Sequence, residues 1–267
     1  MLSDARIPSE TPQPGREVLG VIPARIGSSR LPRKPLLRIA GRPLIEWVWR
    51  RLVSLEVLGE LVVATDDREV LDVVESFGGR AVSTRADHSS GTDRVAEVAE
   101  RPEFFAYRWI INLQGDEPFL PLDAVAAAVG LVRAGWEVGT VAAPIADPAD
   151  WRDPSRVKVV RGDDGRALYF SRAPIPHSRE GANAGEAEPP LLQHLGLYAF
   201  ERASLRRAAV LPPHPLELRE GLEQLRWLAA GLRIGVAVIE SRGVPGIDTR
   251  EDLARAEKLL AGRESSI

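Results

Sequence analysis

Short runs of apolar residues alternate with amphipathic segments along the first half of the chain. The runs have the length of buried strands, and the amphipathic segments repeat their apolar residues at helical spacing. Strands and helices that alternate in this way predict an α/β fold, with a mostly parallel central sheet and helices on both of its faces. The predicted strands cover 18–22, 61–64, 81–83, 109–113 and 138–145, and the predicted helices cover 44–55, 68–77, 95–99 and 122–133.

The second half of the chain has a less regular pattern. Two apolar runs, 156–160 and 167–170, flank the turn sequence Gly162-Asp163-Asp164-Gly165 and predict a β-hairpin. The segment 178–190 is rich in Gly, Ala and Glu without periodicity, which predicts a mobile loop. Further strands are predicted over 193–200 and 233–238, and further helices over 201–210, 216–230 and 252–260.

The domain organisation follows from the continuity of this pattern. No internal repeat or inter-domain linker interrupts it, so we predict one domain over 17–267 with an inserted hairpin and loop region. Residues 1–16 are polar and contain three prolines, at positions 8, 12 and 14, and we expect them to form a disordered tail.

Composition excludes several classes of protein. The net charge of −3 gives no reason to expect a nucleic acid partner. The chain has no cysteine, which excludes disulfides, thiolate metal sites and cysteine nucleophiles. No apolar run is long enough to span a bilayer, and the N-terminus lacks the apolar core of a signal peptide. We therefore expect a cytoplasmic protein without membrane contact.

The first predicted strand leads into a loop that suits an anion. Gly27 and two serines form a small-residue turn whose backbone N–H groups can wrap around phosphate. Arg25, Arg30 and Lys34 add three cations at short intervals, which suits a polyphosphate. The spacing matches neither the Walker nor the dinucleotide pattern. From the composition of the loop alone, a solvated basic loop is the favoured alternative.

Polar residues also follow the other predicted strands. In a parallel sheet the ligand lies beyond the carboxyl ends of the strands, so these residues should meet at one edge. They are found at 25–34, 65–66, 90–94 and 114–117.

Two aspartates at turn-rich positions could hold a metal ion. Asp116 and Asp248 each follow a predicted strand, and Mg²⁺ prefers one or two carboxylates completed by water and phosphate oxygens. Taken singly, a turn residue for Asp116 and a helix cap for Asp248 are at least as good explanations. Similarly, Glu217, Glu220 and Glu223 fall near one face of a predicted helix, which is by default a solvated face.

A set of longer segments resembles a known family. The segments are 21–35, 63–66, 87–94, 112–118, 157–160, 167–176, 194–198, 215–226 and 245–249. In this order they closely resemble the 3-deoxy-manno-octulosonate cytidylyltransferases, the CMP-KDO synthetases of lipopolysaccharide synthesis. The resemblance covers nearly all of the chain except the N-terminal tail.

The resemblance implies a fold, a reaction and a set of site residues. The fold is the Rossmann-like nucleotide-diphospho-sugar transferase type, usually a homodimer, and the reaction joins CTP to KDO with Mg²⁺, giving CMP-KDO and pyrophosphate. The implied CTP-binding residues are Ala24, Arg25, Arg30, Lys34, Ala64, Thr65, Ser90, Gly91, Thr92 and Arg94. The implied catalytic residues are Arg25, Arg30, Lys34 and Asp116, and the implied metal ligands are Asp116 and Asp248. The implied KDO-binding residues are Gln114, Arg172, His194, Tyr198, Glu217, Glu220 and Gln224.

Two positions and the glycine- and alanine-rich segment 178–190 depart from the family pattern. Arg33 stands where the family loop usually has glycine, and His177 stands where a tryptophan is common. They leave an amino-substituted KDO conceivable as the substrate. Two further alternatives are a cytidylyltransferase for another acid sugar, such as sialic acid, and a nucleotide-binding module without catalytic activity. The first should lack the pattern at 216–226, and the second would be free to lose Lys34, Asp116 or Asp248, yet all of these are present.

Overall fold

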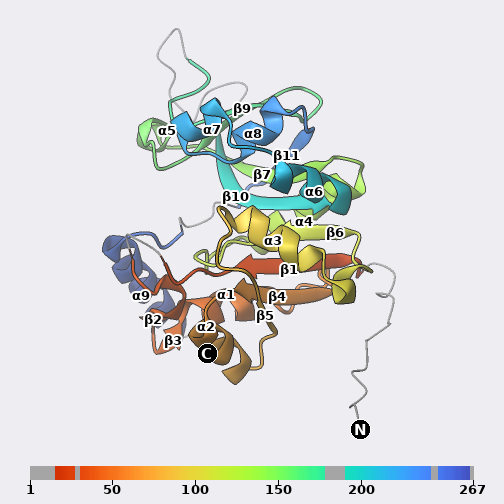
Figure 1. Ribbon diagram of the computed structural model, residues 1–267. Helices are drawn as coiled ribbons and strands as arrows, with labels where there is room; N and C mark the ends of the chain where they lie inside the picture. Colours follow the sequence, from red (N-terminus) through yellow and green to blue (C-terminus); the bar gives the residue numbers. More distant parts are fainter. Residues whose placement is uncertain (1–15, 28–30, 178–189, 242–245, 265–267) are drawn as a thin grey trace.

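The computed structural model describes residues 16–27, 31–177, 190–241 and 246–264 (Figure 1). Within these ranges the strands and helices follow the alternation predicted for an α/β fold. The main-sheet strands are β1 (Val18–Pro23), β4 (Glu60–Thr65), β5 (Ala81–Ser83), β6 (Trp109–Asn112), β7 (Val138–Pro144), β8 (Lys158–Arg161), β9 (Ala167–Ser171), β10 (Leu192–Glu201) and β11 (Ile234–Val238). The helices are α1 (Leu44–Leu52), α2 (Arg68–Ser76), α3 (Gly91–Ala99), α4 (Leu122–Arg133), α5 (Pro148–Arg152), α6 (Arg202–Val210), α7 (Pro215–Glu220), α8 (Gln224–Ala229) and α9 (Arg250–Glu264).

The described strands form one nine-stranded, mostly parallel sheet, as predicted. Its order is β11-β7-β10-β6-β1-β4-β5, and the predicted hairpin, β8 and β9, attaches to the start of β10. Six strands of this path run in one direction, and β10 alone runs antiparallel to its neighbours β6 and β7. Consequently β1, β4, β6, β7 and β11 all end at the same edge.

Helices cover both faces of the sheet, which explains the unbroken apolar runs of the parallel strands. In β1, Val18 and Ile22 belong to the core under α1, α2, α4 and α9, while Leu19 and Val21 belong to the core under α3, α6 and α8. A strand buried on both faces has no polar alternation. In Figure 1 the hairpin, α5, α7 and α8 lie together at one end of the molecule, while α1, α2 and α9 lie at the other.

Several short elements were not predicted. They are the short helices η1 (Lys34–Leu36), η2 (Pro102–Phe104) and α5, and a small two-stranded sheet of β2 (Arg38–Ile39) and β3 (Arg42–Pro43). All are five residues or shorter, so they carry little periodic signal.

Two helix predictions were wrong at their boundaries. The helix predicted over 216–230 is two helices, because Gly221 adopts a left-handed conformation with φ of 62° and ends α7. The helix predicted over 95–99 already begins at Gly91, because Ser90 and Asp93 form a reciprocal capping box.

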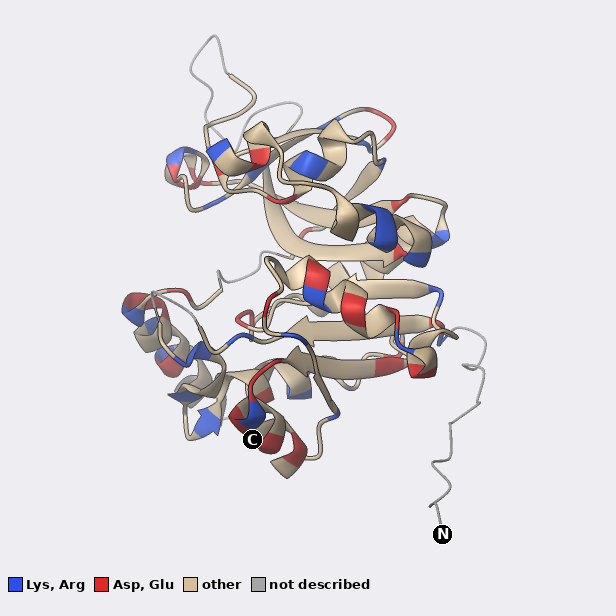
Figure 2. Cartoon of the chain, viewed as in Figure 1, with Lys and Arg blue, Asp and Glu red and all other residues tan. Residues whose placement is uncertain are grey.

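Some predictions fall on parts of the chain that the structure does not describe. Arg30, most of the proposed tail (1–15) and most of the proposed mobile loop (178–189) lie outside the described residues. Within the described residues, no helix has both the length and the apolar character needed to cross a membrane. Acidic and basic residues are interspersed along the helices (Figure 2), so neither sign of charge dominates this view of the molecule.

Candidate active site

Lys34 joins two aspartates at the carboxyl edge of the sheet. It lies at the start of η1, beyond β1, and its Nζ donates to Asp248 Oδ1 at 2.8 Å and also contacts Asp116 Oδ2. Asp116 follows β6, and Asp248 precedes α9. Burial alone would lower the pKa of Lys34, but the charges of Asp116 and Asp248 outweigh burial and raise it. The lysine is therefore held as a cation.

The two aspartate loops are also joined through the backbone. Ile247 N–H donates to the carbonyl of Asp116 at 2.9 Å, and the Ile247 side chain is buried in the core under α9. Gly246 permits this approach, since a Cβ there would lie 3.3 Å from Glu117 Cγ and 3.4 Å from the Asp116 carbonyl oxygen. The positions of Asp116 and Asp248 are thus coupled.

A cavity of about 380 Å³ opens beside this cluster on the side of α3. It brings together residues from the loops after β1 and β6, from the start of α3 and from the segment before α9. The predicted site residues that line it are Ala24, Arg25, Lys34, Ser90, Gly91, Gln114, Asp116 and Asp248. The convergence expected from the strand ends is therefore present for residues from 25–34, 90–94 and 114–117, whereas 65–66 do not line this cavity.

Arg25 fixes the loop on the α3 side of this cavity. Its guanidinium donates to the carbonyl oxygens of His88 (2.8 Å) and Ser89 (3.4 Å). Burial and the nearby charge of Arg94 lower the pKa of Arg25. The loop that Arg25 holds continues into Ser90 and Gly91, where the capping box of Ser90 and Asp93 begins α3 and the positive end of the helix dipole can attract an anion.

Other residues predicted to bind CTP lie behind the cavity wall instead. Ala64 and Thr65 are buried within the sheet, and the Thr92 hydroxyl donates to Glu223. Arg94 is almost fully buried and pairs with Asp66 at 2.8 Å while also donating to Thr84. The structure thus gives Arg94 an internal ion pair rather than a place on the cavity surface.

The residues predicted to bind KDO are divided between several internal contacts. Gln114 donates to the Gly196 carbonyl at 2.9 Å. Arg172 donates to the carbonyls of Pro154 (3.0 Å) and Glu220 (2.7 Å). Glu220 in turn accepts from Ser171 Oγ and from the Arg172 backbone. These contacts hold the end of the hairpin against α7.

The three glutamates do not form the single face that was predicted. Glu217, near the start of α7, closes the capping box of this helix by accepting from His214 N–H. Glu223 lies beyond the end of α7 at Gly221 and contacts Thr92 and Arg226. Gln224 is buried at the start of α8. Glu217 and Glu223 still share one partner across the break at Gly221, since Glu217 Oε1 lies 3.8 Å from the Arg226 guanidinium, which also pairs with Glu223.

His194 and Tyr198 are buried side chains of β10. Thr140 Oγ1 donates to the Leu197 carbonyl at 2.7 Å, so the His194 Nε2–H donates to Thr140 at 2.8 Å. Burial lowers the pKa of His194 to about 3, which keeps the imidazole neutral. Burial, and secondarily the charge of Glu223, raises the pKa of Tyr198 well above its ordinary value.

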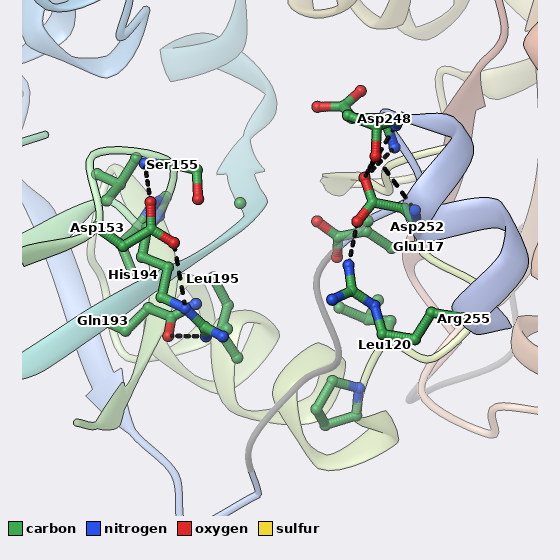
Figure 3. A pocket seen from close by; sticks show the side chains of 16 residues that line it. Glu117, Leu120, Asp153, Ser155, Gln193, His194, Leu195, Asp248, Asp252 and Arg255 are labelled. Atoms are coloured by element: carbon green, nitrogen blue, oxygen red, sulfur yellow. Dashed lines mark hydrogen bonds and ion pairs between the residues drawn. The ribbon is translucent and has the colours of Figure 1, made fainter. Parts of the chain in front are cut away.

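A second cavity of about 430 Å³ lies on the other side of Asp248. Figure 3 shows Asp153, Ser155 and His194 on one wall, facing Asp248, Asp252 and Arg255 on the other. Sequence reasoning missed this cavity and missed Glu117, which lines it. Burial and the adjacent charge of Asp116 raise the pKa of Glu117 to about 8. Its place next to Asp116 in the sequence was the signal that could have identified it.

Known proteins are similar to this chain in sequence over most of its length. The profile of the family described as cytidylyltransferase matches residues 19–234. The 3-deoxy-manno-octulosonate cytidylyltransferase of Gemmatimonas aurantiaca is 51% identical over 240 residues, which are 90% of this chain and 92% of the relative. That of Methylococcus capsulatus is 47% identical over 250 residues, which are 91% and 96% of the two chains.

A solved structure gives the same result. It is described as CMP:2-keto-3-deoxy-manno-octonic acid synthetase complexed with CTP, and it matches with a TM-score of 0.84 at 42% identity. The match covers 92% of this chain and 99% of the other. Agreement of profile, sequence and fold over nearly the full length places this chain in the cytidylyltransferase family, among the 3-deoxy-manno-octulosonate cytidylyltransferases.

Proposed function

We propose that this protein transfers CMP from CTP to KDO, forming CMP-KDO and pyrophosphate. The observation that carries the proposal is the cluster of Lys34, Asp116 and Asp248, which stands between two cavities at the carboxyl edge of the sheet. Relatives with this activity in their names are 51% and 47% identical to the chain, and the matching solved structure is described as a complex with CTP.

The cavity on the α3 side suits CTP. Ser90 and Gly91 at the start of α3 would face the cytidine, and Lys34 with Arg25 would face the phosphates. Arg30, from the same loop, would add a further cation. The acceptor would approach from beyond Asp116, where Gln114 and Gly196 border the β10 side, and Arg172, His194, Tyr198, Glu217, Glu220 and Gln224 remain the residues proposed around it.

The chemistry requires neutralisation of charge on the phosphates. The anomeric hydroxyl of KDO attacks the α-phosphorus of CTP, the new O–P bond forms, and the bond to pyrophosphate breaks on the opposite side. Negative charge builds on the phosphoryl oxygens as this happens. A fixed cation such as Lys34 stabilises that charge more in the transition state than in the ground state, which accelerates the step.

Asp116 and Asp248 would hold Mg²⁺. They converge from separate loops on the Lys34 ammonium, which shows that this point attracts positive charge, and two carboxylates with phosphate oxygens and water are a donor set that Mg²⁺ prefers. In this proposal, phosphate oxygens of the substrate and water complete the coordination. When bound, Mg²⁺ supplies positive charge to the phosphates.

Replacing Asp116 tests the metal assignment. We expect Asp116→Ala to abolish turnover while leaving the circular dichroism spectrum and the melting temperature close to those of the unchanged protein, because Asp116 is partly exposed at a loop. Asp163→Ala, in the exposed hairpin turn, is the matched control. Normal turnover by Asp116→Ala would contradict the assignment.

The function itself is tested by pyrophosphate release from CTP and Mg²⁺, with KDO, 8-amino-KDO and sialic acid offered in parallel. Release with KDO alone is the expected result. Release only with another sugar acid would keep CMP transfer and change the acceptor. Absence of release with all three would favour a nucleotide-binding protein without catalytic activity.

The cytoplasmic location and the homodimer implied by the family remain part of this proposal. Sedimentation at several protein concentrations would test the dimer, and fractionation of cells that make the protein would test the location.

A further inference from the structure

Asp252, in the first turn of α9, binds the segment that carries Asp248. Its Oδ2 accepts from the backbone N–H of Asp248 at 3.1 Å, from the N–H of Thr249 at 2.9 Å and from the Thr249 hydroxyl at 2.9 Å. In return, the Asp252 N–H donates to Thr249 Oγ1 at 3.1 Å. One carboxylate oxygen therefore fixes two successive residues ahead of the helix.

The other oxygen of Asp252 is also engaged. Oδ1 pairs with the guanidinium of Arg255, one turn further along α9 (Figure 3). The Asp252 side chain is 16% exposed, whereas the Asp248 side chain is 44% exposed. Asp252 is thus the half-buried member of the pair, with both carboxylate oxygens bonded, and Asp248 is the more exposed member, which lines both cavities whereas Asp252 lines only the second.

The helix behind Asp252 is anchored in the core. Ala256 and Leu260 of α9 are buried in the same core as Ile247, and Ile247 N–H donates to the carbonyl of Asp116. An unbroken set of contacts therefore runs from α9 through Asp252 and the Asp248 backbone to the Asp116 loop. Its end is the ion pair between Asp248 and Lys34.

We infer that Asp252 is a positioning residue, which holds the Asp248 carboxylate against Lys34 and Asp116 for the reaction. The expected loss of turnover rests on the proposed function, whereas the expected displacement of the Asp248 carboxylate does not. Residues that orient metal-binding or catalytic groups through hydrogen bonds typically contribute about 10- to 100-fold to affinity or activity. The alternative is that Asp252 only completes the capping box that Thr249 begins, which affects stability and nothing else.

A second capping aspartate in the chain separates these two explanations. Asp67 caps α2 by accepting from the N–H groups of Glu69 (2.9 Å) and Val70 (3.1 Å), and it has no place in the proposed machinery. Asp67→Ala therefore removes an aspartate that stabilises the start of another helix, in this case as its N-cap. We expect Asp67→Ala and Asp252→Ala to lower the melting temperature comparably.

Only Asp252→Ala should change the kinetics. At a temperature well below the melting temperatures of both variants, we expect the kcat of Asp252→Ala to be at least tenfold lower than that of the unchanged protein. The Mg²⁺ concentration that gives half the maximal rate should rise. Asp252→Asn should recover part of the loss, because the amide oxygen still accepts from the Asp248 and Thr249 N–H groups. A kinetic loss no larger than that of Asp67→Ala would overturn the inference.

A crystallographic comparison tests the inference without turnover. The contact between Asp248 and Lys34 is 2.8 Å in the unchanged protein. We expect crystal structures to show that Asp252→Asn retains this contact and that Asp252→Ala loses it. Retention of the contact in Asp252→Ala would overturn the inference. If the unchanged protein releases no pyrophosphate from CTP, the proposed function fails, and this structural comparison still decides the role of Asp252.

Discussion

The Lys34 ammonium lies 2.8 Å from the Asp248 carboxylate, although the two residues are 214 positions apart in the sequence. The same ammonium contacts Asp116, so one cation organises two carboxylates that would otherwise repel each other. Lys34 is only 13% exposed, so water screens these interactions less than at the surface. Lys34 therefore holds the Asp116 and Asp248 loops together and offsets part of their negative charge.

Replacing Lys34 should therefore affect catalysis strongly. We expect Lys34→Ala to lower kcat/KM by roughly 100-fold or more, the loss typical of removing one fixed group that stabilises transition-state charge. Steady-state pyrophosphate release measures this. Arg50→Ala, which removes an exposed cation from an i,i+4 pair on α1, is the control and should retain its activity. A Lys34→Ala enzyme as active as this control would contradict the role of Lys34.

Much of this site could be predicted from sequence, because parallel strands leave a strong pattern. The runs that became β1, β4 and β6 are mostly apolar, with polar residues only near the ends of β4 and β6, so their ends could be located, and with them Lys34 and Asp116. Asp248 could be located by its glycine-containing turn. A helix cap was the alternative role for Asp248, but it is Thr249 whose side chain accepts from the Asp252 N–H at the start of α9.

The direction of a side chain at the start of a helix was harder to predict. Arg94 is one helical turn from the cavity but points into the interior, since Asp66 and Thr84 are available there as partners. Likewise, Gly221 looks like an ordinary interruption in a helical pattern, and only its left-handed conformation separates α7 from α8. Such features depend on contacts between distant segments, which periodicity does not record.

Arg94 should be important for stability. The Arg94 side chain is 1% exposed and is paired with Asp66, so we expect Arg94→Ala to lower the free energy of unfolding by about 3 kcal/mol. This value is near the low end for a broken buried ion pair, because Asp66 is partly exposed. Urea unfolding measures the change, with the exposed Arg68→Ala as control. An unchanged unfolding energy together with a raised KM for CTP would instead support direct binding of CTP by Arg94.

Arg33 occupies a backbone conformation that favours glycine. Its φ of 57° and ψ of 30° are left-handed, which explains why glycine is usual at this position in the family. Its exposed pair with Glu69 contributes little to stability. We expect Arg33→Gly to be more stable than Arg33→Ala by roughly 0.5–1 kcal/mol, measured by thermal unfolding. A more stable alanine variant would show that the conformation is not strained.

Glu117 should make stability depend on pH. Its pKa is about 8 in the folded protein, against an ordinary value of 4.5, because burial and then the charge of Asp116 disfavour its ionised form. The folded protein therefore binds a proton that the unfolded chain has released. Stability from this group is full below the ordinary pKa and is lost as the pH rises through about 8.

The interval from pH 6.5 to 8 limits the opposing contribution of His194, and a Glu117 variant separates the effect of Glu117 from that of Glu223, whose pKa is also raised by burial. Below 6.5, the unfolded chain protonates His194, whose folded pKa is about 3, so His194 adds a pH dependence of opposite sign there. We expect the free energy of unfolding, measured in urea with EDTA, to fall between pH 6.5 and 8 by at most about 1.4 kcal/mol per pH unit. Glu117→Gln should remove this decline, whereas the exposed control Glu75→Gln should preserve it. If Glu117→Gln retained the full decline, the proton would have to be bound elsewhere, and Glu117 would be ionised beside Asp116 at neutral pH.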